Sequence, residues 1–332
     1  MTVLQNKKFM QRKYFSTYFS ISAVVLLIIV FTALEPRFLN AANVSNLLSD
    51  TAPLMIMATG MTAVLLLGSI DLSVGAMCSV ANVLVLRVLM SLVEYHNLTG
   101  VSAMILAVLI TLAFSTVAGI ILGVIHVKTK VPSFIASLAF MSIWASVALL
   151  ISSASVALPF SLWDTIAWYN VSFGPLGLPL IFALILIAAY YILLTRTPFG
   201  AGVYAIGANE RAARLAGVPV DRIKITVFAL NGLTTALGAI FLMAHGRSSA
   251  PTAGNEFTLM VVSAVVLGGT ALTGGAGNML NTVIGVFIVA MIRNGMNMVG
   301  VNVFWQSVVY GAVILIAIAI NTDRSARSFA VK

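Results

Sequence analysis

The feature that most constrains this chain is a series of long apolar runs that contain almost no charge. A helix needs about 20 apolar residues to cross the hydrocarbon core of a bilayer, and we count about ten such runs. Of the 332 residues, 61% are hydrophobic and 8% are charged, whereas a soluble globular chain carries about 25% charged residues. The sequence therefore excludes a soluble multidomain protein and predicts a membrane protein. The runs are Phe19–Leu34, Thr51–Leu67, Leu72–Val93, Val101–Ile125, Phe134–Ile151, Leu178–Leu194, Ile225–Ala244, Thr258–Leu272, Met279–Val299 and Val303–Ile320.

These runs predict an all-α fold, a polytopic transmembrane helical bundle of about ten spans. We expect one transmembrane domain over residues 1–332, with its longest cytoplasmic loop at about residues 196–224. The first run, Phe19–Leu34, also resembles a cleaved signal peptide, but it is long for that purpose. Glu35-Pro36-Arg37 follows it without a small-residue cleavage site, so we favour a retained helix.

The positions of the basic residues predict the orientation. With an even number of spans and a cytoplasmic N-terminus, most of the 18 lysines and arginines fall on the cytoplasmic side, which is the usual bias of membrane proteins. The opposite side receives Arg37 and Arg247, and Arg87 and Arg293 lie within spans. We therefore expect both termini in the cytoplasm. The cytoplasmic set is Lys7, Lys8, Arg12, Lys13, Lys128, Lys130, Arg196, Arg211, Arg214, Arg222, Lys224, Arg324, Arg327 and Lys332.

The charge and the reactive residues indicate no chemistry of the chain's own. The net charge of +9 is placed by membrane topology, so it does not predict a nucleic-acid partner. Cys78 is the one cysteine, and the histidines at positions 96, 126 and 245 have no partners at metal-ligand spacing. We predict no catalytic, cofactor-binding or metal-binding residue in this chain, and no enzyme activity.

Polar residues break the apolar pattern at positions that lipid alone does not favour. Asp71, in the segment Gly68–Gly75, lies between two spans among glycine, serine and aliphatic residues. It either lines a hydrophilic path or caps the following helix, and the sequence leaves both open. Arg293, Asn294 and Asn297 form a polar stripe that either faces a path or reaches the outer interface, where Arg293 could instead pair with an acidic residue of a loop. The candidates for a translocation path are Asp71, Ser73, Asn278, Asn294, Asn297 and Gln306.

The glycine-rich segment Gly268–Asn278 permits close backbone approach and tight turns. No lysine in the chain follows a glycine, so the phosphate-binding pattern Gly-x-x-x-x-Gly-Lys-Ser/Thr is absent. The chain therefore carries no nucleotide-binding P-loop.

The loop at 196–224 contains a short helix with clear end signals. Asn209 is placed to cap a helix over Glu210–Ala216, and Gly217 followed by Pro219 ends it. A short, well-capped cytoplasmic helix suits docking into a groove of a partner protein. The alternative is a surface helix that only connects two spans.

The sequence resembles the membrane subunits of bacterial ATP-binding-cassette importers for ribose, arabinose, galactose and related monosaccharides, over nearly the whole chain. The motifs that carry this resemblance are Ile70–Gly75, Val131–Leu138, Ala208–Val220, Ser248–Gly254, Ala264–Asn278 and Gly300–Leu315. The resemblance implies a permease in the bacterial inner membrane, paired with a second permease copy of the same or another kind. It also implies cytoplasmic ATPase subunits that bind ATP and magnesium, and an extracytoplasmic sugar-binding protein. By the same resemblance, the residues that couple to the ATPase are Gly207, Asn209, Glu210, Arg211, Ala213, Arg214 and Gly217.

The chain departs from the pattern of this family at two places. Thr258-Leu259-Met260 stands where many members carry Glu-Leu-Asp, and Trp144-Ala145 where many carry Arg-Gly. Both changes remove charge, so substrate and partner preferences are open. The alternative function is an ion-coupled secondary transporter of a small polar solute. Such a transporter requires ionisable groups inside the membrane, where Asp71 is the nearest candidate. A noncatalytic membrane anchor is a further hypothesis.

Overall fold

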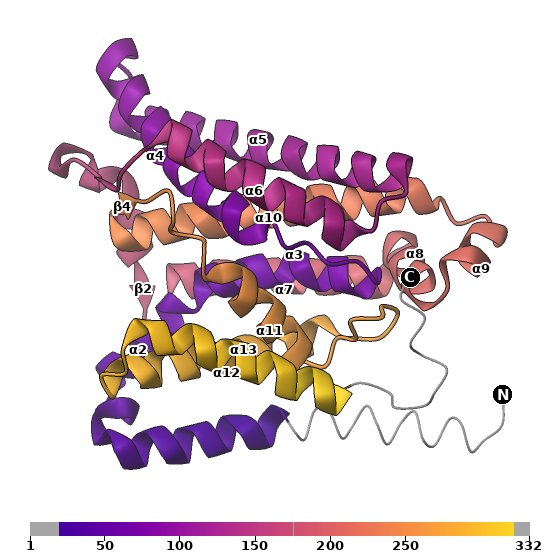
Figure 1. Cartoon of the computed structure of the whole chain (residues 1–332). Helices are drawn as coiled ribbons and strands as arrows, with labels where there is room; N and C mark the ends of the chain where they lie inside the picture. The colour runs from indigo at the N-terminus through magenta and orange to yellow at the C-terminus, as the bar shows by residue number, and fades with distance from the viewer. Residues whose placement is uncertain (1–19, 175, 322–332) are drawn as a thin grey trace.

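The apolar runs fold into a bundle of roughly parallel helices (Figure 1). The computed structural model describes residues 20–174 and 176–321. After a first helix at Ser20–Leu34, the elements are η1 Pro36–Leu39, α2 Ala41–Asp50, α3 Ala52–Leu66, α4 Val74–His96, α5 Gly100–Thr129, α6 Ser133–Ile151, β1 Val156–Ala157, η2 Phe160–Asn170, β2 Ser172–Phe173, β3 Leu176–Gly177, α7 Leu178–Arg196, α8 Pro198–Ala208, α9 Glu210–Leu215, α10 Val220–Gly246, β4 Ser248–Ser249, α11 Phe257–Leu267, α12 Met279–Met298 and α13 Val303–Asn321.

The fold is that of an all-α polytopic membrane protein. Each predicted run coincides with a helix, and among the described residues seven helices are long and apolar enough to cross a membrane. The helix Ser20–Leu34 and α11 are shorter apolar helices. The count of about ten spans and the cytoplasmic placement of both termini stay predictions.

The sequence did not predict helices α2 and α8. Both are set by capping: the Asn40 side chain accepts a hydrogen bond from the Ala42 amide, and the Thr197 side chain accepts one from the Gly200 amide. The predicted run Thr258–Leu272 was too long, because α11 ends at Leu267 and Gly269 takes a positive φ of 85° that an α-helix does not allow.

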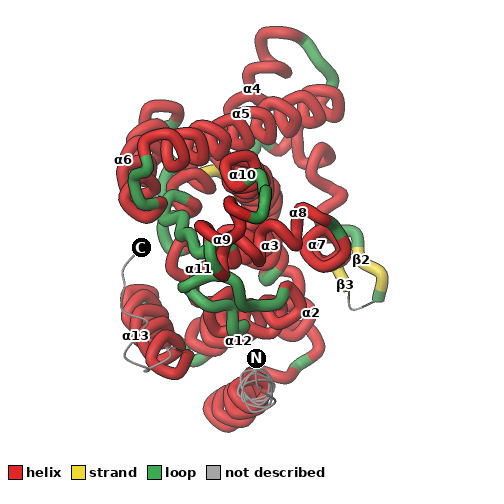
Figure 2. The backbone as a smooth tube through the Cα atoms, turned by 90° about the vertical axis from the view of Figure 1, so that its right-hand side faces the viewer, coloured by secondary structure: helices red, strands yellow, loops and turns green. Residues whose placement is uncertain are grey.

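Helix α3 forms the centre of the bundle, and every residue of it is buried. Figure 2 shows α3 and α10 in the middle, with α5 and α6 on one side and α12 and α13 on the other. In the α2–α3 span 83% of the most apolar window is buried, against 17% in α6. An apolar helix that is so little covered by protein suits contact with lipid, so α6 lies at the periphery of this chain.

Small residues allow α5 and α10 to pack closely along their length. A Cβ atom on Gly119 would lie 2.3 Å from the Phe228 carbonyl oxygen, and one on Gly232 would lie 2.2 Å from the Ser115 carbonyl oxygen. Close contacts between backbone atoms at small residues are typical of helix pairs in membranes, where van der Waals packing replaces the hydrophobic effect. The sequence of α10 thus fixes its distance from α5.

The strands are short and lie in the connections between helices. β1 pairs antiparallel with β4, with Val156 opposite Ser249, and β2 pairs antiparallel with β3. They stand with α2 at one end of the bundle, and α8 and α9 stand at the other end (Figure 1). The two ends therefore differ in structure.

Candidate functional site

The predicted cytoplasmic helix is present as α9, with both predicted end signals in place. The Asn209 side chain accepts a hydrogen bond from the Ala212 amide at 3.0 Å. Gly217 takes a positive φ of 82°, and the amides of Gly217 and Val218 donate to the carbonyls of Arg214 and Ala213. This pair of bonds is a Schellman motif, so α9 is a fixed helical turn rather than an irregular loop.

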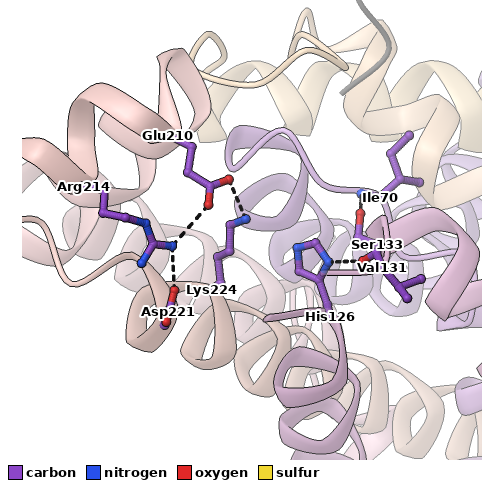
Figure 3. Close-up of polar contacts among 8 residues, drawn as sticks. All are labelled: Ile70, His126, Val131, Ser133, Glu210, Arg214, Asp221 and Lys224. Atoms are coloured by element: carbon purple, nitrogen blue, oxygen red, sulfur yellow. Dashed lines mark hydrogen bonds and ion pairs between the residues drawn. The ribbon is translucent and has the colours of Figure 1, made fainter. Parts of the chain in front are cut away.

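Ion pairs fasten α9 to the first turns of α10 (Figure 3). Glu210 accepts from the Lys224 ammonium at 2.7 Å, and Arg214 donates to Asp221 at 2.7 Å and to Glu210 at 3.4 Å. Burial raises the pKa of Glu210, but the hydrogen bonds and charges of Lys224 and Arg214 outweigh burial and hold the pKa below its ordinary value of 4.5. Glu210 is therefore ionised at neutral pH and keeps both pairs.

One face of α9 remains open. Arg211 and Leu215 are four residues apart, which places them on the same side of a helix. Leu215 is 84% exposed and Arg211 is exposed, whereas Ala213 is buried against the bundle. The helix thus presents one basic and one apolar side chain outward.

Helix α8 joins α9 to the centre of the bundle through Gly207. A Cβ atom on Gly207 would lie 1.9 Å from the Leu66 carbonyl oxygen and 2.4 Å from the Gly275 nitrogen. The Gly275 amide donates to the same Leu66 carbonyl at 2.8 Å. The end of α8 is therefore in backbone contact with the end of α3 and with the glycine-rich loop that leads into α12.

Asp71 lies in the interior, on the chain segment between α3 and α4, and is 6% exposed. One carboxylate oxygen accepts from the amide and the hydroxyl of Ser73, at 2.8 and 2.6 Å. The other accepts from the Asn231 side chain in the middle of α10 at 2.9 Å. In this conformation both carboxylate oxygens accept hydrogen bonds from groups of the protein.

Motifs that are far apart in the sequence meet around Asp71. The amides of Ile70 and Leu72 donate to the hydroxyls of Ser133 and Ser137 at the start of α6, each at 3.0 Å, and Figure 3 shows the first of these bonds. The space beside Asp71, lined also by Ser73 and Trp144, is about 10 Å³. That volume is near the minimum for one water molecule, so no solute fits there in this conformation.

A larger cavity of about 280 Å³ lies at the end of the bundle opposite α9. Its polar wall contains Asp50 and His245, whose side chains are 3.4 Å apart, together with Thr51, Arg293, Asn294 and Asn297. Its apolar wall consists of Leu47, Pro53, Leu54, Leu242, Phe257, Met260 and Ala290.

The predicted path residues lie in three places. Asn294 and Asn297 line the cavity; Asn294 exchanges hydrogen bonds with Asn43, and Gln306 donates to Asn297. Asp71 and Ser73 form the interior cluster. Asn278 caps the opposite end of α12 by accepting from the Leu280 amide. The structure therefore brings the asparagines together with Gln306 but does not join them to Asp71.

The sequence reasoning missed Asp50, His245 and Asn231. In the sequence His245 has no partner at metal-ligand spacing, and its partner in the structure, Asp50, lies on α2, a helix that the apolar runs do not predict. Asn231 had a usable signal, since an asparagine in the middle of an apolar run needs a hydrogen-bond partner inside the membrane.

Comparisons with known proteins identify the family. Residues 43–318 match the family described as "Branched-chain amino acid transport system / permease component". The chain is 38% identical over 307 residues to the Ribose import permease protein RbsC of Bacillus subtilis (strain 168), covering 91% of each chain. It is 36% identical over 310 residues to the protein of that name in Escherichia coli (strain K12), covering 92% of this chain and 93% of the relative.

Two further relatives from Escherichia coli (strain K12) extend the comparison. The Xylose transport system permease protein XylH is 30% identical over 378 aligned positions, which cover 93% of this chain and 92% of the relative. The Probable ABC transporter permease protein YphD is 33% identical over 310 residues, which cover 92% of this chain and 90% of the relative. No solved structure matches the chain. The chain therefore belongs to this family of permease components, alongside relatives named as ABC transporter, ribose and xylose permeases.

Proposed function

We propose that this chain is the membrane-spanning permease subunit of an ATP-binding-cassette importer that moves a monosaccharide across the bacterial inner membrane. The relatives named for ribose and xylose align with it over at least 90% of both chains. The substrate class follows from those names, and the particular sugar is open.

The observation that carries the proposal is helix α9. It is capped at both ends, tied by Glu210 and Arg214 to α10, and exposes Arg211 and Leu215 on one face. A short rigid helix of this kind transmits force from a docked partner, whereas a helix that only connects two spans needs neither the ion pairs nor an open face.

The contact at Gly207 gives α9 a route into the bundle. Movement of α8 and α9 pushes directly on the end of α3 at Leu66 and on the glycine-rich loop at Gly275. Because that loop leads into α12, a displacement at α9 shifts two helices that run to the far end of the bundle.

The family membership supports the partners that we propose for this chain. A separate cytoplasmic ATPase binds ATP with magnesium and supplies the free energy of hydrolysis; the chain itself has no ATPase site and is not an enzyme. An extracytoplasmic sugar-binding protein delivers the substrate, and a second permease copy, identical or not, completes the path. The end that bears α9 faces the cytoplasm, as the basic residues predict.

The family membership favours this importer over an ion-coupled transporter. The geometry agrees, because Asp71 is held by Ser73 and Asn231 rather than open to an ion. We therefore propose no second function.

The test is ATP-dependent uptake of labelled D-ribose, D-xylose, D-galactose and L-arabinose into vesicles that contain the chain, its ATPase and its binding protein. We expect uptake of at least one sugar that requires ATP and the binding protein. Uptake driven instead by a proton or sodium gradient would contradict the proposal.

Variants on the open face of α9 test the docking role. The double variant Arg211→Glu, Leu215→Asp should reduce two quantities by at least about tenfold: the amount of ATPase that co-purifies with the permease, and sugar uptake. The reason is that both changes place a negative charge on the face that we propose enters a groove of the ATPase. The control is Lys130→Glu, which reverses an exposed charge after α5, outside α9. Normal uptake by the double variant at wild-type abundance would remove α9 from the coupling role.

A further inference from the structure

The cavity at the end of the bundle opposite α9 is built from five helices. Residues of α2, α3, α10, α11 and α12 line its volume of about 280 Å³. Pockets that hold small molecules begin at about 300 Å³, and they combine apolar walls with a few placed polar groups. The volume of the cavity is close to this lower limit, and its lining combines both kinds of wall.

Its hydrogen-bonding groups are available to a ligand. In the part of the chain that the structure describes, the Arg293 guanidinium has no hydrogen bond or ion pair within 4.0 Å, although all five of its N–H groups are donors. Within the described ranges Asp50 has one ion-pair partner, His245, at 3.4 Å, and about half of its side chain is exposed. Asn297 accepts from Gln306 through its oxygen, which leaves its amide nitrogen to donate.

The charges of the cavity select the kind of ligand. Asp50 is acidic, Arg293 is basic, and His245 is the remaining titratable residue in the lining. A site with one charge of each sign favours an uncharged molecule over an anion or a cation. Hydroxyl groups both donate and accept, so a polyhydroxylated ligand pairs with a carboxylate and a guanidinium at once.

We propose that this cavity is a binding site of the permease itself for an uncharged monosaccharide. Asp50 accepts hydrogen bonds from its hydroxyls, Arg293 and Asn297 donate to them, and Phe257 and Leu242 contact its C–H face. This inference rests on the proposed function, and it adds a substrate site within one chain.

Two of the helices that line the cavity extend to the end of the bundle that bears α9. Helix α3 contains Pro53 at the cavity and Leu66 at the Gly207 contact, and α10 contains Lys224, which binds Glu210, and His245 at the cavity. A displacement of α9 therefore changes the cavity, so occupancy by the sugar depends on the nucleotide state of the ATPase.

Cysteine protection tests the site without relying on transport. The native Cys78 is fully buried, so it does not compete for a thiol reagent in the folded protein. In the complete complex, Ala290→Cys and Leu47→Cys place reporters on two helices that line the cavity, and Tyr95→Cys is an exposed control at the end of α4, outside it. The probes are D-ribose, D-xylose, D-galactose, L-arabinose and D-ribose 5-phosphate.

We expect a transported sugar to slow labelling at positions 290 and 47 but not at position 95. Adding Arg293→Met or Asp50→Asn to a reporter should raise the half-protecting sugar concentration by at least about tenfold, because each removes a charged hydrogen-bonding group. The matched control is Arg87→Met, since Arg87 donates to Ser152 outside the cavity.

The outcomes separate the two proposals. If no sugar is taken up by the wild-type complex, the proposed function fails and this site fails with it. If a sugar is taken up but protects neither reporter, the importer stands and the site is wrong. Protection by D-ribose 5-phosphate alone would also overturn the inference, because it would show an anion site.

Discussion

At the residue scale, Asp71 shows how this bundle keeps a carboxylate in its interior. A buried carboxylate is costly unless it is paired or hydrogen-bonded, and Asp71 accepts three hydrogen bonds from Ser73 and Asn231. These bonds tie the segment between α3 and α4 to the middle of α10. Trp144, which stands where the resembled family often has arginine, lines the same small space and packs on Phe114 and Phe140.

Exchanging the two partners across this contact tests its role. Asp71→Asn should destabilise the protein, because the amide N–H donors of the new asparagine face the N–H donor of Asn231. The hydrogen bond that is lost had a charged acceptor, and such bonds contribute about 1.5–3 kcal/mol. Asn231→Asp alone should also destabilise it by placing two carboxylates together. The double variant restores one acceptor and one donor, so its thermal midpoint in detergent should exceed both single variants. Additive losses would show that the Asp71–Asn231 bond contributes nothing.

At the element scale, the attachment of α9 depends on ionised side chains. The pKa of Glu210 is lower in the folded chain than its ordinary value of 4.5. The ionised carboxylate therefore stabilises the folded protein fully above pH 4.5, and this stabilisation is lost as the pH falls through the pKa of the folded state. The stability difference between wild type and Glu210→Gln should therefore be constant between about pH 6 and 8 and vanish at acidic pH. Thermal unfolding in detergent across this range measures it. Because the carboxylate is partly exposed, the difference should be small and should fall in high salt. A difference that grows on acidification would contradict this assignment.

Gly207 tests the contact between α8 and the rest of the bundle. Gly207→Ala should leave the ATPase docked but uncouple it, because the new methyl group would lie 1.9 Å from the Leu66 carbonyl oxygen and force the elements apart. We expect ATP hydrolysis to continue while uptake per ATP falls by at least about tenfold, since a shift of this size in a force-transmitting contact misaligns the coupled elements.

Gly311→Ala is the matched control for this experiment. It makes the same change in α13, where an added Cβ meets no atom within 4 Å. Equal coupling in both variants would show that the Gly207 contact does not transmit force.

At the scale of the whole molecule, the two ends of the bundle differ in structure, and we propose a different task for each. One end is basic and holds α8 and α9, for which we propose the docking role, and the other end holds the cavity with Asp50 and Arg293. The orientation follows from the basic residues: a fluorescent-protein fusion to the C-terminus should fluoresce, and an alkaline phosphatase fusion there should be inactive. A phosphatase fusion inserted between Phe173 and Leu176, at the end opposite α9, should be active. The reverse pattern would invert the assignment of both ends.

The sequence by itself determined the membrane class, the helical runs, and the limits of α9. These features depend on local causes: the length of an apolar run, the capping by Asn209, and the positive φ at Gly217. The resemblance carried by its motifs also predicted the family that the comparisons then identified.

Only the tertiary structure decided which polar residues meet. Asp71 and Asn231 are 160 positions apart in the sequence, and the cavity joins Asp50 on α2 to His245 on α10 and Arg293 on α12. An apolar run does not reveal which of its faces contacts lipid and which contacts protein, because both are made of the same residue types in a membrane. The pairing of distant helices therefore had to come from packing, where contacts such as those of Gly207 and Gly232 allow only one close fit.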